Sequence, residues 1–339
     1  MKVKLLALML TMILGLTVLG FAFPQNAACS NTSFKILTIN LLFSEIQDRP
    51  QRLGRIADFV KSTWGSTTTV PVDVILLQEV VGGALVGTNN SAQDLQNLLA
   101  SRGLPYYLNY QLEEALPGLF TQGIAILSRH PIVGSLAETL PNVEVVSFLG
   151  FQVTLRRIAL LNRIDIANYG QVNIYNTHLC SSCDPSGRAQ QVGALLNFIQ
   201  TVEQSYPGGS QIILGGDFNI NLFYANQRPA YQSILSNGFI DTYAAVHNVG
   251  FTCCDPNSGG TCCTFAVPGN PYAFDLTLQP ESPARFDYIF IKGKGMKVLD
   301  SQVVFNSGDW VSDHSGVVTE LQFSHGAPIT GPLDLLLLD

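Results

Sequence analysis

Short apolar runs separated by polar turn residues dominate the chain between residues 34 and 323. A run of this kind, bounded by turn residues, is typical of a strand buried on both faces. Other stretches repeat their apolar residues every three or four positions, which is typical of a helix with one buried face. We therefore predict strands at 34–41, 72–77, 124–127, 158–166, 171–177, 211–214, 285–292, 298–305 and 316–323, and helices at 49–61, 91–101 and 187–204.

The order of these elements indicates the class of fold. Predicted strands alternate with helices in the first half of the chain, and a turn at Asn168-Tyr169-Gly170 pairs two later strands as a hairpin. This mixture predicts an α/β fold with a mixed sheet structure and helices outside it. About 310 residues follow the apolar leader without a clear linker or internal repeat, so we expect one domain over 29–325 and a tail over 326–339.

Polar residues stand where several of the apolar runs end. Asn40, Glu79, His178 and Asp217 each close such a run. Residues at strand ends are held by a rigid scaffold, and sites are usually built there. Carboxylates, amides and imidazoles that meet at one edge can hold a hard cation and position a water beside a phosphate. The pattern therefore predicts a polar site assembled from strand ends.

The segment 215–219, Gly-Gly-Asp-Phe-Asn, is the clearest of these strand ends. Its two glycines allow a sharp turn, and we expect them to leave room for a ligand to approach. Asp217 and Asn219 are two positions apart, so they share a side if the chain is extended. The alternative is an ordinary loop with an Asx turn, because Asp and Asn favour turns.

The leader at 1–28 has the pattern of a secretory signal peptide. A basic start precedes an uncharged apolar run over 5–19, and small residues follow. We predict cleavage after Ala22 or Ala28, and a protein that is secreted or displayed on the cell surface. An uncleaved membrane anchor is the alternative, and Cys29 leaves a lipid anchor open.

Composition narrows the classes of function. Apolar residues make up 47% of the chain and charged residues 13%, which allows a large core and excludes a disordered chain. The formal net charge is −7, and removal of the leader with its two lysines takes it to −9. No basic cluster is visible, which counts against tight, charge-driven binding of long nucleic acid.

Seven cysteines in an exported chain indicate disulfides. We expect three local bridges, with the pairing left open. The alternative is a zinc site built from the four cysteines between 253 and 263, although adjacent ligands have awkward geometry and the C-x-x-C spacing is absent there. Apart from Cys29, the cysteines form three close groups: Cys180 with Cys183, Cys253-Cys254, and Cys262-Cys263.

Six short segments together carry a resemblance that none of them carries alone. In chain order they resemble the motifs of the endonuclease/exonuclease/phosphatase superfamily, which includes pancreatic-type deoxyribonucleases, abasic-site endonucleases, inositol-polyphosphate 5-phosphatases and sphingomyelinases. The resemblance covers about residues 34–323 and implies a four-layer α/β sandwich, with two mixed sheets face to face and helices outside. The segments are Thr38-Ile39-Asn40, Leu77-Gln78-Glu79-Val80, Asn176-Thr177-His178-Leu179, Gly216-Asp217-Phe218-Asn219, Arg285-Phe286-Asp287-Tyr288-Ile289 and Ser312-Asp313-His314.

The resemblance also implies a divalent cation. Glu79 is similar to the principal ligand of an essential Mg²⁺, with Asn40 and Asp313 near it. Mg²⁺ binds few protein oxygens and keeps several waters, which a phosphate can displace. We expect Mn²⁺ or Co²⁺ to substitute for it, and leave open whether one or two metals act.

Five more residues receive roles from the resemblance. His314 looks like the general base or the group that stabilises the attacking water, and Asp287 looks like the partner that fixes its ring. Asp217 and Asn219 look like the pair that orients the water and the phosphoryl oxygens. His178 would bind a phosphate oxygen and stabilise developing charge.

These residue types also suit phosphodiester hydrolysis on chemical grounds, because an anionic ester that repels hydroxide needs a cation, a base and hydrogen-bond donors. Each residue alone has an ordinary explanation. His178 would be a core histidine, Asp313-His314 a turn, and Asp287 an ion-pair partner of Arg285. Three histidines outside the motifs are expected to be surface or structural residues: His130 in a turn, His247 in a loop and His325 in the tail.

The substrate has to be inferred from features between the motifs. Arg188 and Gln190-Gln191 open a helix after the Thr-His-Leu motif, which looks like the sphingomyelinase branch, and so does segment 282–289. Val80-Val81-Gly82 departs from that branch, in which an aromatic residue usually follows the glutamate. We expect a phospholipid phosphodiesterase of sphingomyelinase-C type. A deoxyribonuclease-I-type endonuclease and a binding module without activity are the alternatives.

Two stretches offer apolar surface for a bilayer. Segment 143–151 holds two phenylalanines, and segment 251–274 combines the paired cysteines with several aromatic residues. Aromatic hairpins are good interfacial anchors. The alternatives are a core strand for the first and a rigid surface loop for the second. As partners we expect a phospholipid or other phosphodiester substrate and peripheral membrane contact, with nucleic acid disfavoured and no obligate protein partner.

Overall fold

The structure is a computed structural model, and the residues that it describes lie within Asn31–Asp339. The predicted leader at 1–28, Cys29, His325 and the tail at 326–339 lie outside the described residues. The described ranges are 32–43, 48–62, 71–84, 86, 89–116, 119–148, 151–167, 169–205, 211–274 and 279–324.

One six-stranded sheet combines the first strands of the chain with the last two, in the order β11-β12-β1-β2-β4-β3. β1 and β2 run parallel, and the other neighbours are antiparallel. The sheet is therefore mixed, as predicted. Its strands are β1 (Thr32–Asn40), β2 (Val74–Gly82), β3 (Tyr107–Leu116), β4 (Phe120–Ser128), β11 (Met296–Val304) and β12 (Gly316–Phe323).

A second six-stranded sheet takes the middle of the chain, in the order β5-β6-β7-β8-β10-β9. Here β7 and β8 are the parallel pair. The predicted hairpin is present, because β6 and β7 pair antiparallel up to Ile166 opposite Gly170. The strands are β5 (Ile132–Phe148), β6 (Phe151–Ile166), β7 (Gly170–His178), β8 (Ile212–Asp217), β9 (Ile240–Asp241) and β10 (Asp287–Lys292).

Alternating side chains divide each central strand between two cores. In β1, Phe34 and Ile36 pack between the two sheets, whereas Leu37 and Ile39 pack under the helices. Successive side chains of a strand point to opposite faces, so a slip by one residue would exchange the two sets. Each such side chain contributes roughly 1.5–3 kcal/mol when fully buried, and this fixes the register of the strand ends.

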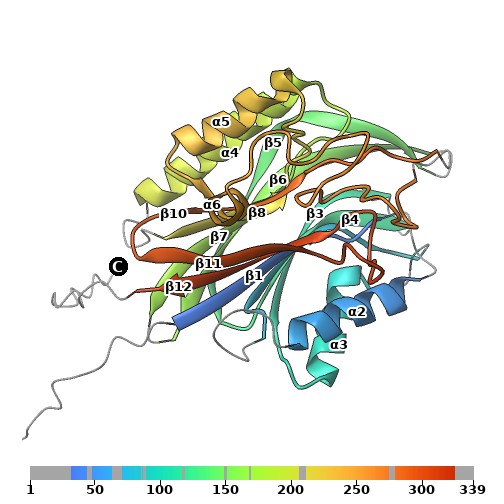
Figure 1. Cartoon of the computed structure of the whole chain (residues 1–339). Coiled ribbons are helices and arrows are strands. Elements are labelled where there is room, and N and C mark those ends of the chain that lie inside the picture. The colour runs from blue at the N-terminus through green and yellow to red at the C-terminus, as the bar shows by residue number, and fades with distance from the viewer. Residues whose placement is uncertain are drawn as a thin grey trace, which may run out of the picture. The chain divides into compact units, whose positions relative to one another are not determined.

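Helices cover the outer face of each sheet, which completes the four predicted layers (Figure 1). α2 and α3 pack on β1, β2 and β4, and α4 and α5 pack on β7, β8 and β10. A proline in the first turn starts α2, and the Asn90 side chain caps α3 by accepting from the Gln93 amide. The helices are α2 (Arg49–Lys61), α3 (Ser91–Ser101), α4 (Pro185–Ser205), α5 (Arg228–Ser236), α6 (Thr242–His247) and the 3₁₀ turn η1 (Ala225–Gln227).

The hydrophobic pattern of the sequence predicted most of the buried helices and strands, but it missed several elements that are partly exposed. The helices at 49–61 and 91–101 and the strand at 316–323 have the predicted bounds. β3 and β5 were not predicted, because these edge strands carry polar residues among their apolar ones and leave Leu112 and Val133 43% and 51% exposed. The short helices α5 and α6 were also missed. The strand predicted at 72–77, and closed by Glu79, runs instead from Val74 to Gly82.

The six described cysteines form three local disulfides, as expected: Cys180–Cys183, Cys253–Cys262 and Cys254–Cys263. The alternative of a zinc site is wrong, because two of these bridges use all four of its cysteines.

Two histidines outside the motifs have structural partners. His130 contacts Asp73, with its Nε2 3.1 Å from Oδ1. His247 does not lie in a loop, as predicted, but ends α6, where its Nε2 is 2.6 Å from the Ser301 carbonyl oxygen. Both histidines are therefore explained by packing.

Candidate active site

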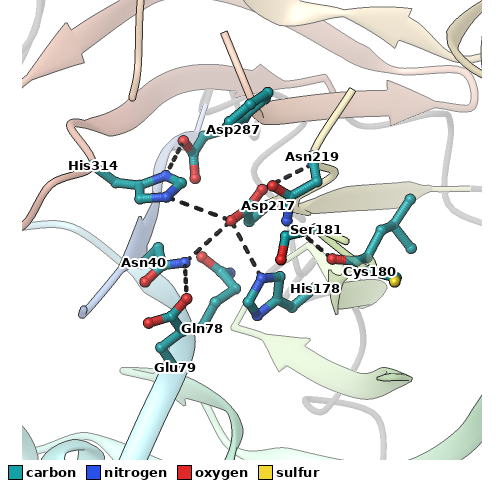
Figure 2. Close-up of polar contacts among 12 residues, drawn as sticks. Asn40, Gln78, Glu79, His178, Cys180, Ser181, Asp217, Asn219, Asp287 and His314 are labelled. Carbon is teal, nitrogen blue, oxygen red and sulfur yellow. Dashed lines mark hydrogen bonds and ion pairs between the residues drawn. The ribbon is translucent and has the colours of Figure 1, made fainter. Parts of the chain in front are cut away.

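The polar strand ends meet around one centre (Figure 2). Because β1 is parallel to β2 and β7 to β8, each pair brings its carboxyl ends to the same edge. The register places Asn40 beside Gln78, and His178 beside Asp217. β10 enters antiparallel, with Asp287 opposite Asp217.

Asn40 connects the two sheets across this centre. Its Nδ2 donates to Glu79 Oε1 at 3.0 Å and to Asp217 Oδ2 at 3.1 Å. Its Oδ1 accepts from the Leu42 amide at 3.0 Å. Asn40 is fully buried, so these bonds lock the ends of β1, β2 and β8 together.

A β-bulge aims Glu79 at the centre. The pairing of β2 with β4 shifts between Leu77 and Val80, and Glu79 has a φ of 53°. A bulge redirects a side chain, and a left-handed glutamate persists only where its surroundings hold it. Glu79 Oε2 accepts from the Phe43 amide at 2.7 Å. Burial raises the pKa of Glu79, and the negative charge of Asp313 raises it further.

Asp313 lies in a bend that precedes β12, and the next residue, His314, forms an isolated β-bridge with Phe265. Ser312 Oγ donates to Asp313 Oδ1 at 2.9 Å and fixes the carboxylate. Burial raises the pKa of Asp313, although the adjacent His314 opposes this effect. The structure thus places two acidic groups, Glu79 and Asp313, where their charges interact.

His314 lies between two carboxylates. Its Nδ1 is 2.8 Å from Asp287 Oδ2, and its Nε2 is 3.7 Å from Asp217 Oδ2. Burial disfavours the imidazolium, but Asp287 and Asp217 outweigh it and raise the pKa of His314 well above its usual value. The alternative that Asp287 pairs with Arg285 is wrong, because Arg285 bonds Asp241 at 2.8 Å instead.

Asp217 Oδ2 is the point on which three donors converge. Asn40 Nδ2 is 3.1 Å away, His178 Nε2 3.4 Å and His314 Nε2 3.7 Å. Burial raises the pKa of Asp217 to about 7, against the lowering effect of His314. A carboxyl group that titrates near neutrality, in contact with a charged imidazole, suits proton transfer.

His178 is buried and neutral. Burial lowers the pKa of His178 well below its usual value, and the neighbouring cations Arg157 and His314 lower it further. A core histidine was the alternative to a functional one. Its Nε2 nevertheless lies 3.4 Å from Asp217 Oδ2, so the ring belongs to the same polar cluster.

The Gly-Gly-Asp-Phe-Asn segment differs from the prediction in two ways. A Cβ on Gly216 would lie 2.0 Å from the Thr177 carbonyl oxygen, and one on Gly215 would lie 2.6 Å from Leu76 Cδ1. The missing Cβ atoms of these glycines therefore make room for residues of neighbouring strands, and not for a ligand. Asn219 does not continue an extended strand, because it has a φ of 50° and its amide donates to Asp217 Oδ1 at 2.9 Å, which is the Asx turn of the alternative.

Among the residues that the structure describes at this centre, two groups of side chains have the chemistry to hold a cation. Asp217, Asp287 and His314 place ligand atoms within 4.8 Å of one another. In that group both ring nitrogens face carboxylates, so a cation would have to displace a proton from the imidazole. Glu79 and Asp313 fit better, because both are carboxylates whose pKa values burial raises and both remain partly exposed. A hard cation would neutralise them.

A buried amide pair beneath the site was not found from the sequence. Gln78 Nε2 donates to Asn176 Oδ1 at 2.7 Å. Asn176 Nδ2 donates to the carbonyls of Leu77 and Ala125 at 3.0 and 2.9 Å. These bonds join β7 to β2 and β4 of the other sheet. The available signal was position, since both amides lie inside the motif segments.

Comparisons with known proteins agree with this geometry. A profile of the Endonuclease/Exonuclease/phosphatase family matches residues 37–314. A search of curated proteins found no match. No helix within the described ranges is long and apolar enough to cross a bilayer.

Solved structures share the fold at low sequence identity. An endonuclease/exonuclease/phosphatase from Beutenbergia cavernae is 22% identical, with a TM-score of 0.61, over 88% of this chain and 73% of that one. The human Nocturnin catalytic domain with bound sulfate is 15% identical, with a TM-score of 0.57, over 87% and 98%.

A mannosyl-6-phosphatase from Bacteroides thetaiotaomicron is 18% identical to this chain, with a TM-score of 0.55, over 86% of this chain and 100% of that one. At these identities the structures establish the fold. The profile match establishes the family as well as the fold, because it spans most of the chain and contains all six motif segments. Members of this family are phosphoester hydrolases that depend on divalent metals. The chain belongs to the Endonuclease/Exonuclease/phosphatase family.

Proposed function

We propose that this protein is a secreted, Mg²⁺-dependent phosphodiesterase of the sphingomyelinase-C type. The observation that supports the hydrolase assignment is the cluster around Asp217 Oδ2, where Asn40, His178 and His314 converge beside the Glu79 carboxylate. A phosphodiester needs a cation, a proton acceptor and donors for its equatorial oxygens. Each is available within this cluster.

Glu79 and Asp313 are our proposed cation ligands. Asn40 faces Glu79 with its amide nitrogen, which does not bind cations. Asn40 becomes a third protein ligand only if its amide flips about χ2, which would replace its present bonds to Glu79, Asp217 and the Leu42 amide. A bound Mg²⁺ supplies charge neutralisation for the phosphate and lowers the pKa of a bound water.

The Asp217–His314–Asp287 network is our proposed proton acceptor. Asp217 has a pKa of about 7, whereas Asp287 holds a proton on the His314 ring. Because the two groups interact, the proton of the attacking water is taken up by the pair rather than by one residue. His314 then remains cationic beside the phosphate, where it stabilises negative charge that develops during attack.

His178 and Asn219 have different proposed tasks. His178 donates from Nε2 to a phosphoryl oxygen. Asn219 Nδ2 donates to the Leu179 carbonyl at 3.0 Å, and its amide bonds Asp217. Asn219 is therefore a positioning residue, which holds Asp217 next to the end of β7, and we do not assign it a contact with the phosphate.

The phospholipid part of the proposal rests on surface and sequence features. Val143 and Val145 on β5 are 54% and 56% exposed, and Phe274 is 47% exposed. This exposure excludes a core strand at Val143 and leaves apolar side chains for a bilayer. Side chains at 146–153 lie outside the described residues.

One cue for the sphingomyelinase branch has a structural explanation. Arg188 Nη1 donates to the Ser181 carbonyl at 3.1 Å, and Gln191 Oε1 accepts from the Cys180 amide at 2.8 Å. Both side chains hold the loop closed by Cys180–Cys183, so they support that branch through the shape of the loop and not through contact with a headgroup.

Parallel assays distinguish this proposal from its alternatives. Purified protein is incubated with sphingomyelin vesicles, plasmid DNA and mannose 6-phosphate, each with Mg²⁺ or with EDTA. We expect Mg²⁺-dependent release of phosphocholine. Cleavage of DNA alone would indicate the deoxyribonuclease alternative, release of phosphate alone a monoesterase, and no cleavage a binding module.

Secretion is proposed from the leader and the three disulfides. Expression of the full chain followed by intact-mass analysis of the culture medium tests it. We expect a mature protein that begins at Phe23 or Cys29, or a lipid-modified Cys29 in the membrane fraction. An intracellular protein that retains residue 1 would contradict secretion.

A further inference from the structure

A buried charge cluster lies directly behind His178 and has no part in the mechanism above. Arg157 on β6 is 2% exposed, and it faces Glu144 on β5 and Glu113 on β3. Two strands of the cluster belong to one sheet and the third belongs to the other. A cluster of charges in a core is costly to bury, so its contacts with the site deserve an explanation.

The guanidinium of Arg157 divides its donors between an acid and the imidazole. Nη2 and Nε donate to Glu144 Oε2 at 2.5 and 3.2 Å, a two-pronged contact that fixes the plane of the group. Nη1 lies 3.6 Å from Glu113 Oε2 and 2.9 Å from His178 Nδ1. Arg157 thus contacts His178 from the side opposite Asp217.

The chemistry of arginine decides which nitrogen of His178 carries the proton. A guanidinium has five N–H donors, no acceptor, and stays protonated in proteins. His178 Nδ1 must therefore accept the bond from Arg157, so it carries no hydrogen. A neutral imidazole has one N–H, and here that hydrogen is on Nε2, which lies 3.4 Å from Asp217 Oδ2 at the centre of the site.

We propose that Arg157 is a positioning residue that holds His178 in the neutral Nε2–H tautomer, so that the ring offers a hydrogen-bond donor to a phosphoryl oxygen. This inference rests on the proposed phosphodiesterase function for its kinetic consequence. The tautomer itself follows from the Arg157 contact alone. The usual partner for such a histidine, a carboxylate or carbonyl at Nδ1, would select the opposite tautomer and present an acceptor to the anion.

Glu144 extends the same connection to the disulfide loop. Its Oε1 accepts from Ser181 Oγ at 2.5 Å and from the Ser182 amide at 3.0 Å. Its Oε2 accepts from Arg157 and from the Ser181 amide, the latter at 3.3 Å. The loop that follows His178 therefore holds Glu144, Glu144 orients Arg157, and Arg157 orients His178.

The first test is spectroscopic and does not depend on activity. The chain has five histidines, and ¹⁵N labelling of their rings allows His178 to be assigned by its loss in His178→Gln. We expect Nδ1 of His178 to show the shift of an unprotonated nitrogen and Nε2 that of a protonated one, unchanged from pH 5 to 8. A proton on Nδ1, or on both nitrogens, would overturn the proposal.

The second test measures turnover of bis(p-nitrophenyl) phosphate with Mg²⁺, which avoids any choice of lipid headgroup. Arg157→Met keeps much of the side-chain length and removes every donor. We expect kcat to fall about 10²-fold with KM nearly unchanged, the size of losing one donor to developing charge. Arg157→Lys retains a cationic donor and should recover part of the loss. The matched control is Arg156→Met on the same strand, whose side chain is 60% exposed, and it should keep full turnover.

A double-mutant cycle separates positioning from a merely structural role. If Arg157 acts through His178, Arg157→Met should change kcat little in a His178→Ala background. An equal loss in both backgrounds would show that Arg157 only supports the fold. If Arg157→Met does not fold, the ring spectrum of the unaltered protein still decides the tautomer. If the unaltered protein has no phosphodiesterase activity, the proposed function fails while the tautomer remains tested.

Discussion

Replacement of Glu79 by glutamine separates cation binding from folding. Glu79→Gln keeps the length of the side chain and an acceptor for the Phe43 amide, but it removes the charge. Burial and the charge of Asp313 both raise the pKa of Glu79, so the ionised carboxylate opposes folding when no cation is present. The metal-free variant should therefore be at least as stable as the unaltered protein.

The size of the cation effect follows from mass action. At a free Mg²⁺ concentration one hundred times Kd, binding to the folded state adds about 2.7 kcal/mol. For a folded chain of about 310 residues, whose entropy of unfolding is about 0.65 kcal/mol/K, that corresponds to a rise in Tm of roughly 4 °C. Glu79→Gln removes one of two carboxylate ligands, so most of this rise should disappear. Loss of an outer partner of a metal costs about 10–100-fold in activity, and loss of a direct ligand should lower kcat by at least about 10²-fold.

Thermal unfolding in EDTA and in a Mg²⁺ titration measures both effects, with turnover recorded on the same samples. Glu138→Gln is the matched control, because Glu138 is an exposed acid on β5 outside the site. A Tm of the unaltered protein that does not respond to Mg²⁺ would refute the cation site. So would a Glu79→Gln protein with the full Mg²⁺ response and near-normal turnover.

Other predictions concern the proton network and the backbone beneath it. The pKa of Asp217 is about 7 in the folded protein and about 3.8 in the unfolded chain. Between these two pH values the folded state retains a proton that the unfolded state releases, so the free energy of unfolding falls as the pH rises. The free energy of unfolding of the metal-free protein, measured in urea relative to Asp217→Asn, should fall by roughly 4 kcal/mol from pH 4 to 8, and a rise would contradict the assignment. His314→Ala should lower turnover by at least about 10²-fold and flatten the acidic limb of the pH–rate curve of the residual activity, and an unchanged limb would mean that another group takes the proton. Gly216→Ala should lower the free energy of unfolding in urea by at least about 2–3 kcal/mol, because the added Cβ would lie 2.0 Å from the Thr177 carbonyl oxygen. Gly193→Ala in α4, which has open space around it, should be neutral or stabilising. Equal stability of the two variants would show that the close contact between β7 and Gly216 does not require a glycine.

The strand ends were predictable because their causes are local. An apolar run followed by Asn40, Asp217 or His178 is visible in the sequence, and parallel pairing then brings such ends to one edge. The same reasoning misjudged the glycines before Asp217. Their neighbours, Leu76 and the Thr177 carbonyl, come from other strands, and no local pattern reveals them.

The remainder of the site depends on contacts between distant segments. The bulge that turns Glu79 inward arises where β2 pairs with β4, and the sequence of β2 alone reads as the end of a strand. Arg157 carries no motif, and Glu144 lies in a stretch interpreted as membrane-facing. Their roles emerge only once β6 is paired with β5 and β7. Charges buried by pairing across a sheet are therefore the features that sequence patterns miss.

The central claim is that Glu79 and Asp313 hold a divalent cation beside a phosphate-binding cluster. Crystals grown with Mn²⁺ and phosphate, with anomalous diffraction recorded at the manganese edge, test it most directly. We predict a peak bound by both carboxylates, and a phosphate whose oxygen accepts from His178 Nε2. A manganese peak between Asp217, Asp287 and His314 instead, or phosphate bound away from His178, would contradict the account.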